Sequence, residues 1–217
     1  MIGTAGEEIQ GLGADCAWSG SNFARRVSQS LPGTREIMPD IADLSPEVDD
    51  ANRTCRAIIE TPKGSRNKFD YDPETRLFRL GGLLPEGMTF PFDFGFIPST
   101  LGGDGDPLDI MVLMDAPAHS GCLIEVRIIG VISARQTEDG KTETNDRLLG
   151  VAVHSYQHED VQTIGDVNKT ILSQVEEFFI SYNRQRGKQF KVTGKEGPEV
   201  ALKVLKKGIK LFGKRKK

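Results

Sequence analysis

The segment Asp104-Gly105-Asp106-Pro107-Leu108-Asp109 limits what this chain can fold into, because it places three carboxylates within six residues. Two ionised carboxylates about 4 Å apart repel each other by about 4 kcal/mol at an effective dielectric constant near 20. Gly105 permits a tight turn, and Pro107 fixes its own backbone. Such a segment is either a solvated acidic turn or a cation site. Oxygen donors without His or Cys favour Mg²⁺, Mn²⁺ or Ca²⁺.

The segments on both sides of this loop favour the metal site. Residues 90–98 read FPFDFGFIP, and residues 110–114 are apolar throughout. An EF-hand is excluded because the glycine at its sixth position and its terminal glutamate are missing. An aromatic-Pro-x-x-aromatic-Gly-aromatic-Ile run followed by Asp-Gly-Asp-Pro-hydrophobic-Asp closely resembles the signature of soluble family I inorganic pyrophosphatases. The resemblance implies metal-dependent hydrolysis of pyrophosphate to two orthophosphates.

Length and composition limit the number of domains and the class of protein. The 217 residues suit one domain with some additional chain, and 37% hydrophobic residues with 27% charged residues suit a globular protein. Three cysteines without metal-ligand spacing favour a reducing compartment. No run approaches the roughly 18 to 20 apolar residues of a membrane span, and no secretory signal pattern is present. We therefore expect a cytoplasmic protein without membrane contact.

The chain divides into three predicted regions. Residues 1–54 lack hydrophobic periodicity and are rich in Gly, Ser and acidic residues, which predicts an irregular or partly disordered extension. Residues 55–212 form the segment that we assign as the pyrophosphatase domain. Residues 213–217 form a basic tail.

Hydrophobic patterns predict an α+β fold that is mainly β. Short strands separated by turns are predicted at 55–60, 67–71, 76–80, 110–114, 122–132 and 148–153, as in a small antiparallel barrel. One helix is predicted after Asp166 as N-cap, with Ile171 on its buried face, and another from Pro198. The resemblance implies the same architecture: an OB-like five-stranded antiparallel barrel with two helices of the C-terminal half packed outside.

The resemblance also implies roles for the acidic residues. Asp104 and Asp109 match metal ligands, and Asp106 matches the carboxylate that accepts a proton from the attacking water. Glu60 and Asp70 match further acids of the cavity, where Asp70 stands in for a longer glutamate. Considered alone, without the resemblance, Glu60 would be read as an exposed acid on an edge strand.

Four residues match the phosphate-binding groups of the family. Lys68 belongs to a Lys-aromatic-acid triplet, and Arg147 stands where the family has a lysine. The family has an arginine at the position that aligns with Gly81. Arg79 lies close to this position and could take its place after a small shift of the strand. Tyr182 matches a phosphate-binding hydroxyl, although its helical spacing also places it on the core face.

The chain departs from the family pattern at several positions. Phe94 lacks the expected hydroxyl, and Asn183 replaces a lysine. In the hairpin, Thr137 and Asn145 occupy positions expected to be acidic, and we expect Asp146 to serve as a metal ligand if a strand bulge brings it in. These changes remove negative charge from the metal site and positive charge from the phosphate site. We therefore expect hydrolysis to persist with weaker metal or substrate binding.

A non-enzymatic role is the alternative. The segment 203–217 is basic, OB-like folds often bind single-stranded nucleic acid, and a weakened homologue could act as a binding protein through this tail. Nucleic acid is disfavoured because the aromatic residues cluster beside carboxylates and not beside lysines. The resemblance further implies self-association, as a hexamer.

Overall fold

The computed structural model describes residues 39–215, which belong to one compact unit. Residues 1–38, most of the predicted N-terminal extension, and residues 216–217 of the predicted tail lie outside the described residues. The elements follow the chain in this order: η1 (Ile41–Asp43), β1 (Thr54–Thr61), β2 (Asn67–Asp72), β3 (Leu77–Leu83), β4 (Asp93–Ile97), β5 (Leu108–Leu113), β6 (Leu123–Glu138), β7 (Lys141–Thr144), β8 (Arg147–Ala152), η2 (Ile164–Asp166), α2 (Lys169–Gln185), β9 (Gln189–Glu196) and α3 (Pro198–Arg215).

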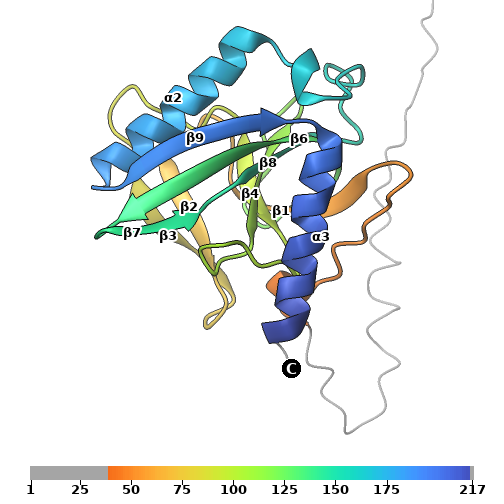
Figure 1. Cartoon of the computed structure of the whole chain (residues 1–217), viewed down its shortest axis with the longest axis horizontal. Helices are drawn as coiled ribbons and strands as arrows, with labels where there is room; N and C mark the ends of the chain where they lie inside the picture. The colour runs from red at the N-terminus through yellow and green to blue at the C-terminus, as the bar shows by residue number, and fades with distance from the viewer. Residues whose placement is uncertain (1–38, 216–217) are drawn as a thin grey trace, which may run out of the picture. The chain divides into compact units, whose positions relative to one another are not determined.

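Five strands close into a barrel (Figure 1). Their order is β1-β4-β5-β8-β6, and β6 pairs with β1 to complete the ring. Four of these pairings are antiparallel, whereas β5 and β8 run parallel. The predicted OB-like five-stranded barrel is confirmed, with one parallel pairing where only antiparallel ones were expected. The 16 residues of β6 connect the ring to β7 and β9 as well.

The two long helices cover different parts of the barrel (Figure 1). Ala201 and Leu205 of α3 belong to one buried apolar cluster together with β1, β5 and β6 residues. Val175 and Phe179 of α2 belong to another, which includes Phe94 of β4. Each helix therefore buries an apolar stripe against strands, as the helical periodicity predicts.

Helix α2 begins two residues later than the sequence predicts. Its N-cap is Asn168, and Asp166 instead accepts the backbone N–H of Thr163 at 2.8 Å in the η2 turn. On the first turn of the helix Leu172 joins the buried cluster, while Ile171 is 40% exposed. The prediction that Ile171 faces the core is therefore wrong.

Besides β7, two further parts of the sheet system lie outside the ring. β2 and β3 form a separate two-stranded sheet, and β9 pairs with β6. Strands β4 and β9 were not among the strands predicted from hydrophobic patterns. Within residues 39–215, no helix combines the length and the hydropathy that crossing a membrane requires.

Residues 39–53, which end the predicted extension, contact the body of the protein. The Tyr71 hydroxyl donates to Asp40 at 2.9 Å, and the Ser99 N–H donates to the Ala42 carbonyl at 2.7 Å. These contacts join the segment to the β2–β3 sheet and to the chain after β4.

Candidate active site

The acidic loop joins β4 to β5 and is held by its own backbone. The Gly102 N–H donates to the Asp106 carbonyl at 2.7 Å, and the Asp106 N–H donates to Asp104 Oδ1 at 3.2 Å. Gly105 has a φ of +91°, a conformation that residues with a side chain rarely adopt. The loop thus folds back on itself and leaves the Asp106 side chain exposed.

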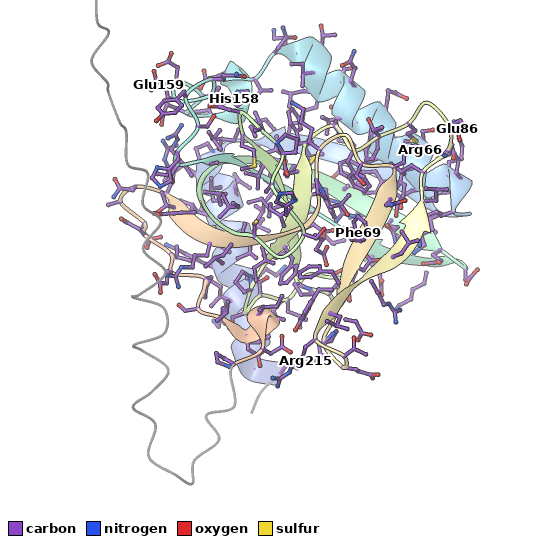
Figure 2. The ribbon with its side chains drawn as sticks, turned by 180° about the vertical axis from the view of Figure 1, so that it is seen from behind. Arg66, Phe69, Glu86, His158, Glu159 and Arg215 are labelled. Carbon is purple, nitrogen blue, oxygen red and sulfur yellow. The ribbon has the colours of Figure 1, made fainter. Side chains whose placement is uncertain are left out.

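Helix α3 supports this loop from outside. The Leu101 N–H donates to the Gly208 carbonyl at 3.1 Å, and a Cβ at position 208 would lie 2.5 Å from Leu108 Cδ1. At the end of α3, Arg215 (Figure 2) donates to the Gly105 carbonyl at 3.4 Å. The close approach between helix and loop depends on the missing side chain at position 208.

Asp109 and Arg147 face each other across the parallel pairing of β5 and β8. Their side chains form an ion pair. Burial raises the pKa of Asp109 to about 6, against the opposing effect of Arg147 and with a further contribution from Asp104. The Arg147 guanidinium also lies 5.5 to 5.8 Å from the centroids of three aromatic rings, those of Phe94, Phe179 and Phe190.

The side-chain amide of Asn145 lies beside Arg147 and connects it to a second amide, that of Gln136. Asn145 is buried, its Oδ1 accepts a hydrogen bond from Arg147, and its Nδ2 donates to Gln136 Oε1 at 3.1 Å. The amide of Asn145 is thus engaged within the protein and adds no negative charge. Gln136 was not identified from the sequence.

Glu60 and Lys68 approach the acidic loop from β1 and β2. Glu60 accepts a backbone N–H of β2 at 2.8 Å. Burial raises the pKa of Glu60 to about 7, and the charges of Asp109 and Asp106 contribute, which places Glu60 near the loop. Lys68 forms an ion pair with Asp70, and burial lowers the pKa of Lys68. These predicted residues therefore gather around the loop.

Tyr182 reaches the same cluster from the last turns of α2. Its ring stacks on Phe178 with centroids 6.0 Å apart, and its hydroxyl accepts a hydrogen bond from Arg186 Nη1 at 2.8 Å. Burial raises the pKa of Tyr182, and the charges acting on it include those of Arg186, Arg147 and Asp109. Tyr182 therefore both packs in the core and faces the charged cluster. Arg186 was not identified from sequence.

Arg79 lies apart from the cluster. Its guanidinium is 3.4 Å from Asp72, and its side chain is 70% exposed. The neighbouring position 81 has no room for a side chain, because a Cβ there would lie 1.6 Å from Asp70 Oδ2. The structure therefore brings no guanidinium from β3 to the acidic loop.

Asp146 lies near the acidic loop, but its side chain is hydrogen-bonded elsewhere. It lines a cavity of about 20 Å³ together with Asp104 and Asp109. Its Oδ1, however, accepts the Ala134 N–H at 3.1 Å. Burial raises the pKa of Asp146, and the neighbouring charges that act on it include Lys207 of α3. Its side chain is thus anchored to β6.

The donor set of the acidic loop fits a hard divalent cation. Its carboxylates offer oxygen only, and burial raises the pKa of both Asp104 and Asp109, to which the neighbouring acidic charges add. Within the described part of the chain, no three His, Cys, Asp or Glu side chains are arranged to hold an ion by themselves. Mg²⁺ commonly binds one or two carboxylates together with phosphate oxygens and water. The carboxylates of the loop therefore suit an ion that is shared with a phosphate ligand.

Comparison with known proteins decides the family. A family model described as inorganic pyrophosphatase matches residues 57–212, well over half of the chain. The chain belongs to the inorganic pyrophosphatase family. The inorganic pyrophosphatase of Geobacillus stearothermophilus is 34% identical over 165 residues, which cover 76% of this chain and 98% of that one. The inorganic pyrophosphatase of Thermus thermophilus is 35% identical over 169 residues, which cover 76% of this chain and 91% of that one.

Solved structures agree with this membership of the pyrophosphatase family. The crystal structure of the Thermus thermophilus inorganic pyrophosphatase superposes with a TM-score of 0.73 at 32% identity, covering 81% of this chain and 99% of that chain. The inorganic pyrophosphatase of Helicobacter pylori gives a TM-score of 0.70 at 30% identity, covering 77% and 98%. The fold predicted from sequence is thus the fold of this family.

Proposed function

We propose that this chain hydrolyses inorganic pyrophosphate to two orthophosphates, with Mg²⁺ as its divalent ion and Mn²⁺ as the alternative ion. The observation that carries the proposal is the gathering of Asp104, Asp106 and Asp109 in one loop beside the cationic side chains of Lys68 and Arg147. Phosphoryl transfer is catalysed mainly by positioning and by charge neutralisation, and this arrangement offers both.

The acidic residues divide into two groups in this proposal. Asp104 and Asp109 would hold the divalent ion, with Asp106 and Asp146 as further oxygen donors. When bound, such an ion lowers the pKa of a coordinated water and neutralises phosphate oxygens. Glu60 and Asp70 would contribute through water, and Asp70 also through its ion pair with Lys68.

Asp106 is the group that would accept the proton of the attacking water. Its side chain is exposed, it lies at the tip of the loop, and its own backbone N–H is used to orient Asp104. Asp109, by contrast, is committed to Arg147. Asp106 is therefore the loop carboxylate with most freedom to contact water and substrate.

The cationic residues would hold the two phosphoryl groups. Lys68 and Arg147 enter from β2 and β8, and Tyr182 adds a hydroxyl from α2. Arg147 is held by Asp109, Asn145 and three aromatic rings, so its guanidinium is fixed in position before substrate arrives. Pre-organised charge of this kind lowers a reaction barrier without reorganisation at the moment of reaction.

The non-enzymatic alternative gains no support from the fold or from the relatives. We further propose a cytoplasmic location and self-association as a hexamer. Light scattering over the micromolar range checks the second point, because a monomer at every concentration would contradict it.

Phosphate release from pyrophosphate tests the proposed activity. The assay compares Mg²⁺, Mn²⁺ and EDTA with the same protein preparation. Release with Mg²⁺ that EDTA abolishes is the expected result. Absence of release with either ion would refute the proposed activity.

A further inference from the structure

Arg186 is a cation at the proposed phosphate site that the family pattern does not assign. It follows the last residue of α2, and its side chain is exposed. Its guanidinium lies over the Tyr182 ring at 5.4 Å from the centroid and donates to the Tyr182 hydroxyl at 2.8 Å. The residue is thereby held at the hydroxyl proposed to bind phosphate.

The guanidinium of Arg186 lies against the β2–β3 sheet at a position where the sheet has no side chain of its own. A Cβ at Gly82 would lie 3.2 Å from Arg186 Nη1. Gly82 is the cross-strand partner of Lys68. Directly paired residues present their side chains on the same face of a sheet, so Arg186 occupies the space beside Lys68.

Arg186 differs from the other cations of the site in its ion pairing. Lys68 is paired with Asp70, and Arg147 is paired with Asp109. Among residues 39–215, no carboxylate forms an ion pair with Arg186. A guanidinium carries five N–H donors in a planar fork that matches phosphate oxygens, and the hydrogen bond to Tyr182 uses one of them.

We propose that Arg186 binds a phosphoryl group of the substrate directly, together with Lys68 and Tyr182, and supplies the guanidinium that β3 does not bring to the site. This inference rests on the proposed function for the identity of the substrate. The geometry itself requires only a phosphate-bearing anion. Charge-assisted hydrogen bonds from arginine to phosphate are among the stronger ones in proteins.

Kinetics of matched variants test this role. KM and kcat for pyrophosphate are measured for the unaltered chain, Arg186→Ala, Arg186→Lys and Arg184→Ala at one free Mg²⁺ concentration. Arg184 is the control because it is another exposed arginine at the same end of α2. We expect Arg186→Ala to raise KM about tenfold, equivalent to about 1.4 kcal/mol, Arg186→Lys to recover part of that, and Arg184→Ala to match the unaltered chain.

A binding measurement keeps the test independent of turnover. Calorimetry with methylenediphosphonate, which is not hydrolysed, should show the same order of Kd values among the four proteins. If hydrolysis fails but this order holds, the proposed function falls and the role of Arg186 stands. Equal Kd and KM values for Arg186→Ala and Arg184→Ala would overturn the inference. Failure of the unaltered chain to bind the probe would overturn the inference about Arg186, whereas the proposed activity is judged by phosphate release.

A double-mutant cycle separates direct binding from support of Tyr182. If Arg186 contacts phosphate itself, Arg186→Ala weakens probe binding in the Tyr182→Phe background as well. If Arg186 serves only to hold the hydroxyl, the second substitution has no further effect, which would contradict direct binding.

Discussion

Asp109 and Arg147 stand side by side on the two parallel strands of an otherwise antiparallel barrel, and their side chains form an ion pair. The arginine also contacts Asn145 and three aromatic rings, while the carboxylate belongs to the acidic loop. One pairing thus couples the proposed metal site to the proposed phosphate site.

Removing the positive member of this pair should destabilise the protein. Arg147→Met leaves Asp109 partly buried without its partner, and we expect the free energy of unfolding to fall by about 3 kcal/mol. Urea unfolding in EDTA measures this loss. Arg135→Met is the control, because Arg135 is exposed on β6. A loss of the same size in both variants would contradict the importance of the pair.

Asp106→Asn should remove turnover and leave the fold intact. The substitution keeps the size of the side chain and removes its ability to accept a proton, and loss of a general base typically costs about 10² to 10⁴ in rate. Phosphate release from pyrophosphate and thermal unfolding are measured together. Asp139→Asn, in the exposed β6–β7 turn, is the control. Unchanged turnover in Asp106→Asn would refute the assignment of Asp106.

Glu60 should give the metal-free protein a pH-dependent stability. Burial raises its pKa from 4.5 to about 7, so the native state binds this proton more tightly than the unfolded state. The stability that it contributes is complete below pH 4.5 and is lost as pH rises through about 7. Glu60→Gln should lack this loss, which is on the order of 2 kcal/mol.

The measurement for Glu60 is the free energy of unfolding in EDTA at pH 5 and pH 8. Glu74→Gln, an exposed acid in the β2–β3 turn, should retain the pH dependence of the unaltered chain. If the free energy of unfolding changes by the same amount between pH 5 and pH 8 in Glu60→Gln and in Glu74→Gln, then Glu60 is not the titrating group.

Two glycines of α3 should respond in opposite directions to the same substitution. No atom lies within 4 Å of a Cβ at Gly213, so Gly213→Ala should stabilise the helix by up to about 1 kcal/mol. At Gly208 the added methyl group would meet Leu108 at 2.5 Å, and Gly208→Ala should destabilise by about 1 to 3 kcal/mol. Urea unfolding of both variants checks this, and a gain in both would show that the loop yields easily.

The sequence predicts the local features of the site well, because they depend on residues adjacent in the chain. The acidic loop, the Lys68-x-Asp70 pair and the strands β2 and β5 are recognisable from short patterns, whereas β4, which precedes the loop, is not. Arg186 was missed because its place depends on a contact between segments far apart in the chain, the end of α2 and Gly82 of β3. Gln136 was missed because its contact with Asn145 depends on how the adjacent β6–β7 hairpin is paired.

The predicted start of α2 is wrong because a neighbouring turn uses the side chain expected to cap the helix. Asp166 has the chemistry of a helix N-cap, yet its carboxylate is used by the preceding η2 turn, and Asn168 caps α2 instead. Strand β9 carries only one fully buried side chain, Phe190, so its apolar pattern is too weak to predict a strand. Its pairing with β6 supplies the order that the pattern lacks.

The contact between α3 and the acidic loop has a consequence for synthesis. Every proposed catalytic, metal-binding and substrate-binding residue precedes Pro198, and the helix that braces the loop through Gly208 follows it. A chain synthesised only as far as residue 197 therefore contains all the chemical groups of the site, but its acidic loop lacks the helix that braces it. The helix that contacts the acidic loop is thus the last described part of the chain to be made, and it contributes none of the proposed catalytic groups.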